Sequence, residues 1–122
     1  MKKKFVLSIV VFMLSSVSYA EGTVTCAGTV DKIQYHIPGV YYLKLSSMNQ
    51  AVAFCSSESN WAPAGESRTI TPETCKQLYS TFLSAKMAGK EFSVVYFDGD
   101  DVPTSCNTWG DWKSASVRFF SF

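Results

Sequence analysis

The chain has 122 residues, of which 47% are hydrophobic and 15% aromatic, and its formal net charge is +1 at pH 7. This composition is typical of a folded domain, because disordered segments are poor in aromatic residues and rich in charge. Lys2, Lys3 and Lys4 are three of the eleven basic residues, so 8 basic and 10 acidic residues remain beyond them, a formal charge of −2. No basic stripe is left to neutralise phosphates, and we expect no nucleic-acid binding.

The first 20 residues have the pattern of a signal peptide. The lysines precede an apolar run from Phe5 to Leu14, and Ser18-Tyr19-Ala20 is typical of a cleavage site. The apolar run is shorter than the roughly 20 residues that span a bilayer. We therefore predict a signal peptide over residues 1–20 and one exported domain over residues 21–122, periplasmic or secreted, with no membrane segment in the mature form.

The domain carries four cysteines, and their even number in an exported chain favours two disulfides. Four cysteines allow three pairings, and their spacing does not choose among them. A zinc site is disfavoured because the chain has no C-x-x-C motif and His36 is its one histidine. We predict two disulfides, no metal and no other cofactor. The cysteines are Cys26, Cys55, Cys75 and Cys106.

Three strands are predicted at the start of the domain. The range 22–37 is rich in β-formers and contains Gly28, which suggests a bulge or a close backbone approach. Pro38-Gly39 is a turn signal, and the range 40–45 is the return strand of a hairpin. The range 51–55 is a short third strand, which completes a meander.

A helix is predicted after a polar loop over residues 56–70. Thr71-Pro72-Glu73 is a strong helix start, since threonine caps free amides, proline suits the first helical position and glutamate complements the dipole. Gly89 is well placed to end the helix. Apolar residues recur at helical spacing between these ends: Cys75, Leu78, Phe82 and Ala85.

Two strands and a long loop follow the helix. The range 92–97 is an apolar strand, and the range 98–111 is a polar loop. The last strand is predicted over residues 113–122, with one face formed by Ala115, Val117 and Phe119.

The resulting order, β-β-β-α-β-β, predicts a mainly β fold with one helix, arranged as a small Greek-key barrel of the oligonucleotide/oligosaccharide-binding (OB) type. Such a barrel places the first strand beside the fourth in antiparallel sense. Cys26, on the first strand, then meets Cys106, which follows the fourth strand. Cys55 and Cys75 are left to close the loop between the third strand and the helix.

Four short motifs in the middle of the chain form a pattern: Ala53-Phe54-Cys55, Trp61-Ala62-Pro63, the helix from Lys76-Gln77-Leu78-Tyr79 to Ala88-Gly89-Lys90, and the strand from Phe92 to Phe97. In these motifs the chain resembles the B subunit of subtilase cytotoxin, the receptor-binding part of an AB5 toxin. The resemblance implies an OB fold, export, glycan binding, a ring-shaped homo-pentamer and an exported enzymatic subunit as partner. The range 64–74 departs from the family as an insertion that brings Cys75, and no sugar-contacting residue is transferred.

The segment from Cys106 to Trp112 is the strongest candidate for ligand recognition. A sugar presents apolar C–H faces edged by hydroxyls, so its site needs an aromatic platform beside amide and carboxylate groups on a fixed loop. The alternative is that the two indoles of this segment cover the end of the barrel. The candidate ligand-binding residues are Asn107, Trp109, Asp111 and Trp112, with Trp61 from the tripeptide above.

Two other polar groups have plainer interpretations. The turn Asp98-Gly99-Asp100-Asp101 lacks the ligand pattern of an EF-hand, which favours a solvated acidic turn over a calcium site. His36 lies near a hairpin end without a G-x-S-x-G element or a free thiol, so we expect no enzyme.

We predict an exported, non-catalytic binding module that resembles a glycan-binding toxin B subunit. The alternative is a periplasmic protein-binding module, such as an inhibitor or an assembly accessory.

Overall fold

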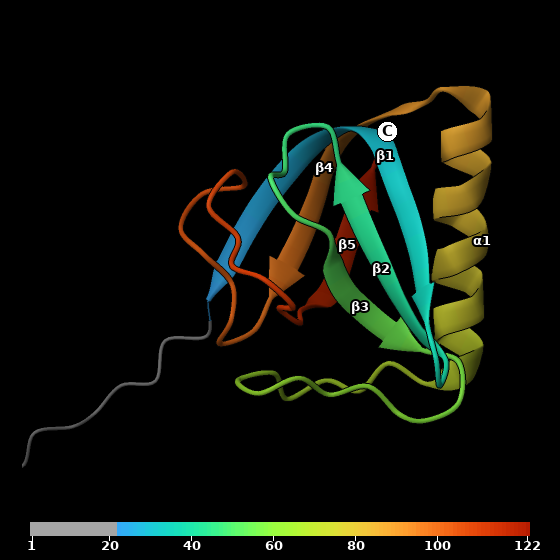
Figure 1. Ribbon diagram of the computed structural model, residues 1–122, viewed down its shortest axis with the longest axis vertical. Coiled ribbons are helices and arrows are strands. Elements are labelled where there is room, and N and C mark those ends of the chain that lie inside the picture. The colour runs from blue at the N-terminus through green and yellow to red at the C-terminus, as the bar shows by residue number, and fades with distance from the viewer. Residues whose placement is uncertain (1–21) are drawn as a thin grey trace, which may run out of the picture.

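The computed structural model describes residues 22–122, so the predicted signal peptide lies outside the described residues (Figure 1). The predicted element order is confirmed, and the protein is mainly β with one helix. The elements are β1 (Thr23–His36), β2 (Val40–Leu45), β3 (Val52–Ser56), α1 (Pro72–Ala88), β4 (Glu91–Asp98) and β5 (Ser116–Ser121).

The strands form one five-stranded antiparallel sheet in the order β3-β2-β1-β4-β5. The long strand β1 is central, because its second half pairs with β2 and its first half with β4. Its register against β4 shifts between Cys26 and Gly28, where the extra residue belongs to β4, so of the two features predicted at Gly28 the structure shows the close backbone approach. Gly28 has a φ of 120°, and a Cβ there would collide with Ser46 Oγ, so only glycine fits this close approach.

The sheet curls until its two edges approach each other. Ala53 of β3 donates its N–H to the carbonyl of Lys113 (3.0 Å), and its own carbonyl accepts from Ala115 N–H (2.9 Å). This short parallel bridge precedes β5. The strand predicted from residue 113 therefore begins later, at Ser116, because residues 113–115 pair with β3 before the chain joins β4.

The prediction that Ala115, Val117 and Phe119 share one face of the last strand is wrong at Phe119. Phe97 pairs with Val117 while the preceding Tyr96 pairs with Phe119, so β5 carries one extra residue, Arg118, at this point. A bulge of this kind reverses the alternation of side chains beyond it. Phe119 is accordingly 52% exposed, and Phe120 turns toward the core in its place.

The predicted helix is confirmed at both ends. Thr71 caps it, since its Oγ1 accepts from Thr74 N–H (3.3 Å), and Gly89 ends it with a left-handed φ of 65°. The helix stands along one side of the sheet, and the loop over residues 99–115 lies on the side away from it (Figure 1). The buried ring of Phe82, on the helix, meets phenylalanines of three strands. Within residues 22–122, no helix is long and apolar enough to cross a membrane.

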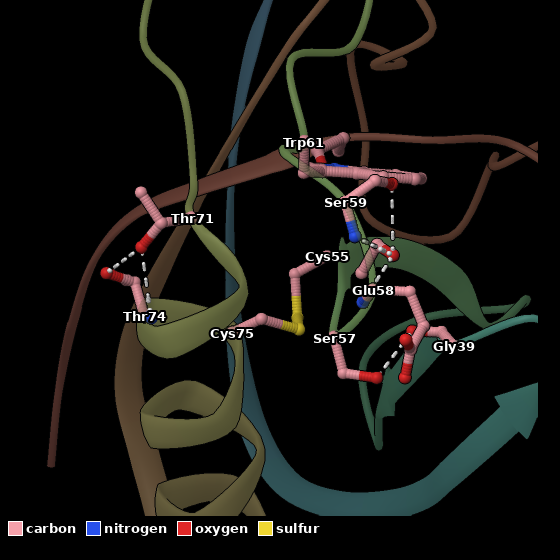
Figure 2. Close-up of a disulfide and its surroundings, with 11 residues drawn as sticks. Gly39, Cys55, Ser57, Glu58, Ser59, Trp61, Thr71, Thr74 and Cys75 are labelled. Carbon is pink, nitrogen blue, oxygen red and sulfur yellow. Dashed lines mark hydrogen bonds between the residues drawn. A yellow bond between two sulfur atoms is a disulfide. The ribbon is translucent and has the colours of Figure 1, made fainter.

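Both predicted disulfides are present, and they pair all four cysteines. Cys26 joins Cys106 with a Cα–Cα distance of 5.7 Å, and Cys55 joins Cys75 with 5.4 Å. Figure 2 shows Cys75, in the first turn of α1, bonded to Cys55 of β3. The first bond ties the 99–115 loop to the central strand, and the second closes the loop between β3 and the helix.

Candidate functional site

The loop over residues 99–115 is held to the sheet along its length. Cys106 fixes it to β1 through the disulfide. Asn49, in the turn between β2 and β3, makes two hydrogen bonds to the backbone of Trp109. Its Nδ2 donates to the carbonyl (2.9 Å), and its Oδ1 accepts from the N–H (2.8 Å). The loop then ends in the hydrogen bonds with Ala53. A binding group on this loop is therefore positioned before any ligand arrives.

Trp109, one of the predicted ligand-binding residues, belongs to the core. Its side chain is 3% exposed, and its indole stands nearly perpendicular to the Phe97 ring, with 5.6 Å between the ring centroids. An edge-to-face contact of this kind is a favourable aromatic geometry. This burial agrees with the packing role that the alternative prediction gives to both indoles.

Trp112, in contrast to the buried Trp109, lies on the surface. It is 75% exposed and has a φ of 56°, the left-handed region that costs a non-glycine residue about 1–2 kcal/mol. Its ring stands nearly perpendicular to those of Tyr42 (6.0 Å between centroids) and His36 (5.9 Å). An exposed indole held in a strained conformation at a fixed position points to a functional role.

A hollow of about 260 Å³ lies beside Trp112, and we call it the Trp112 hollow. Gln34 and Tyr42, in its lining, are direct neighbours across β1 and β2 and project from the same face. Gln50, also in the lining, donates from Nε2 to Asp111 Oδ1 (2.8 Å). The hollow thus combines an aromatic ring with two amides and a carboxylate. The lining residues are Gln34, Tyr42, Gln50, Ala51, Asp111 and Trp112.

A second hollow, of about 450 Å³, lies beside Trp61, and we call it the Trp61 hollow. The Trp61 indole is half-buried, and its Nε1–H donates to the carbonyl of Ala115 (2.9 Å). Ser59, Asn60, Pro63, Asp101 and Ser114 are among the residues around it.

The predicted ligand-binding residues are therefore divided among several places. Asp111 and Trp112 share the Trp112 hollow, and Trp61 lines the other hollow. Trp109 is in the core. Asn107 lies on the surface, where its Oδ1 accepts from Ser105 Oγ (2.7 Å), and it lines neither hollow.

Sequence reasoning missed the part of the Trp112 hollow that comes from the sheet. Tyr42 had a usable signal, because alternation along residues 40–45 puts it opposite the core-facing Leu43. The position of Gln34 beside Tyr42 can be deduced once the hairpin register is known. Gln50 had no signal, since it lies in a turn 61 residues from its partner Asp111.

The acidic turn is not solvated at Asp98. That residue is 2% exposed, and its Oδ2 accepts from Arg68 Nη2 (2.8 Å) and from Arg118 Nε (2.9 Å). Its Oδ1 accepts from Thr23 Oγ1 (2.6 Å). A buried carboxylate needs such partners, and both arginines come from segments far away in the sequence. Among residues 22–122, no three His, Cys, Asp or Glu side chains gather in a way that could hold a metal ion.

Glu66 extends this cluster. Its side chain is fully buried, and both of its oxygens accept from the Arg68 guanidinium at 2.9 Å. The hydrogen bonds from Arg68 hold the pKa of Glu66 below its usual value. Through Arg68 the cluster attaches the loop between β3 and α1 to Asp98 of β4, and through Arg118 to β5.

Acid is expected to weaken the fold through Glu66. Because its pKa is lowered in the folded chain, its contribution is complete above the unfolded value near 4.5 and is lost as the pH falls through the lower folded pKa. Urea unfolding between pH 7 and pH 3 should show a stability that falls on the acid side. Glu66→Gln should be less stable than the wild type at pH 7 and should lose less on acidification. Parallel curves for the two proteins would contradict this role.

No protein-family model, curated protein or solved structure matches the chain. The resemblance to the subtilase cytotoxin B subunit thus stays a prediction from short motifs.

Proposed function

We propose that this protein is a non-catalytic carbohydrate-binding module that holds a sugar in the Trp112 hollow. The observation that carries the proposal is the exposed Trp112 indole, fixed at a left-handed backbone position beside Asp111. The indole offers its face to the C–H side of a sugar ring. Gln34, Gln50 and Asp111 offer donors and acceptors to the hydroxyls at the ring's edge.

The proposal includes an OB-type barrel. The bridge between Ala53 and residues 113–115 supports it, because it brings the first and last strands of the sheet order together. OB folds bind oligosaccharides with the face of their second and third strands and with the loops that follow their first and fourth strands. The lining of the Trp112 hollow supports the proposal, since Tyr42 comes from β2 and Trp112 from the loop after β4.

The proposal also places the protein outside the cytoplasm. Both disulfides support this location, since such bonds persist in oxidising compartments. The formal charge of −2 beyond the N-terminal lysines adds no attraction for polyanions, so recognition in this proposal depends on stacking and hydrogen bonds.

Removing the indole is expected to remove sugar binding. The wild-type protein is screened on a glycan array, and its strongest oligosaccharide is then titrated by calorimetry. Trp112→Gly should weaken that affinity at least about 30-fold, as expected for a binding hot spot worth about 2 kcal/mol. Trp112→Phe keeps an aromatic platform and should retain part of the affinity.

Substitution by glycine tests the loss of the Trp112 ring without a change in the backbone conformation. Glycine adopts the left-handed conformation at no steric cost, so the loop should keep its course in Trp112→Gly. Phe119→Ala, which removes another exposed aromatic ring from β5, is the matched control and should bind like the wild type. A folded wild-type protein without any glycan ligand would defeat the carbohydrate proposal and favour the protein-binding alternative.

A further inference from the structure

We infer that the ligand is a chain of several sugars, and that a second unit of this chain binds in the Trp61 hollow. This inference rests on the proposed function of the Trp112 hollow. It adds a second subsite and the length of the ligand, and it follows from three properties: a fixed aromatic platform, polar groups of the right kind, and continuity with the first hollow.

The platform is fixed because the Trp61 ring and backbone are both anchored. The indole N–H donates to the Ala115 carbonyl, and this hydrogen bond sets the orientation of the ring. The backbone N–H of Trp61 donates to the Ile70 carbonyl, and its carbonyl accepts from Ile70 N–H, both at 2.9 Å. Figure 2 shows Trp61 beside Ser59, on the segment that leaves β3 near the disulfide. A ring with its N–H already bonded offers its π face rather than a donor.

The polar groups of the Trp61 hollow resemble those of the Trp112 hollow in chemistry. Asn60 is exposed and supplies a carboxamide with both a donor and an acceptor. Asp101 supplies a carboxylate, which Ser114 N–H approaches at 3.5 Å and Lys113 Nζ at 4.0 Å. Pro63 adds apolar surface beside the indole. Each hollow thus combines one tryptophan, amide nitrogen and oxygen, and one carboxylate.

The two hollows share a stretch of the same loop. Trp112 lines one hollow and Ser114 lines the other. Two residues of extended chain span at most about 7 Å, so the walls of the hollows are neighbours. Lys113 lies between them, with its backbone fixed to Ala53 of β3. In this inference one oligosaccharide contacts both tryptophans, with one sugar unit in each hollow.

The test measures how affinity depends on ligand length. The probes are mono-, di-, tri- and tetrasaccharides that share the terminal sugar selected on the array, titrated into the wild type and three variants. Affinity for the wild type should rise with length. Asn60→Ala should lower the tri- and tetrasaccharide affinities about fivefold, the effect of one lost hydrogen bond, and leave the monosaccharide affinity unchanged. Trp112→Gly should lose affinity for every probe.

Asn107→Ala is the matched control, because Asn107 is an exposed asparagine that lines neither hollow. It should bind every probe like the wild type. If the wild type binds without length dependence and Asn60→Ala has no effect, the second subsite is wrong and the proposed function stands. If Asn60→Ala weakens all lengths equally, the second subsite is also wrong, because the Trp61 hollow then holds the first sugar. If no probe and no array glycan binds the folded wild type, the proposed function itself is wrong.

Discussion

Replacing Cys26 and Cys106 together by alanine is expected to lower the free energy of unfolding by about 4 kcal/mol. The bond closes a loop of 80 residues, and the stabilisation that a disulfide gives by restricting the unfolded chain grows with the logarithm of loop length. The Cys55–Cys75 bond lies inside this loop and shortens its effective length, and the expected loss of about 4 kcal/mol includes this effect. Because a domain of this size is stable by about 5–15 kcal/mol, the variant should be close to unfolding at 37 °C.

Urea denaturation without reductant measures this effect. The reference is the variant that lacks the other bond, Cys55→Ala with Cys75→Ala, which closes only 20 residues and should lose about 3 kcal/mol from the same entropy term. Both of its cysteines are fully buried, so lost packing adds to that value. If removing Cys26–Cys106 changes the unfolding free energy by less than about 1 kcal/mol, the bond does not restrict the unfolded chain as argued.

The features that sequence predicted well have local signals or depend only on element order. The helix was found because Thr71 and Gly89 mark its ends, and capping depends on neighbouring residues alone. The disulfide pairs were found because the order of strands decides which segments lie side by side. Cys26 and Cys106 could be paired from topology although 80 residues separate them.

The site was only partly predictable, because burial in a loop is decided at long range. Trp109 and Trp112 are three residues apart in one polar segment, and nothing in the segment distinguishes them. Trp109 packs against Phe97 in the core and is hydrogen-bonded by Asn49, whereas Trp112 itself adopts the left-handed conformation and stays exposed. The residue that decides this, Asn49, is 60 positions away.

Errors in the last strand and in the acidic turn have the same origin. A bulge at Arg118 exchanged the expected sides of Phe119 and Phe120, and one inserted residue leaves no mark in a regular alternation. The same Arg118 then reaches Asp98 and, together with Arg68, converts an apparently solvated aspartate into a buried one. Ion pairs between distant segments cannot be derived from the charge of either segment alone.

Phe82→Ala is expected to destabilise the fold by about 4 kcal/mol, within the range for large-to-small changes of buried phenylalanine. The Phe82 ring is fully buried, and its centroid lies 5.3 Å from Phe54 of β3, 5.5 Å from Phe92 of β4 and 5.7 Å from Phe120 of β5. Because β3 and β5 are the two ends of the sheet order, this one side chain joins both edges to the helix. Its loss leaves a cavity where they converge.

The effect can be separated from a general loss of helix by a variant on the outer side of α1. Met87 is 81% exposed, and Met87→Ala should change the unfolding free energy by no more than about 0.5 kcal/mol. Phe82→Leu keeps most of the volume and should cost less than half as much as alanine. Urea denaturation of the three variants should give this order. Equal effects of Phe82→Ala and Met87→Ala would mean that Phe82 does not hold the curled sheet on the helix. The approach of β3 to the start of β5 would then need another cause. The wall between the two hollows depends on that approach.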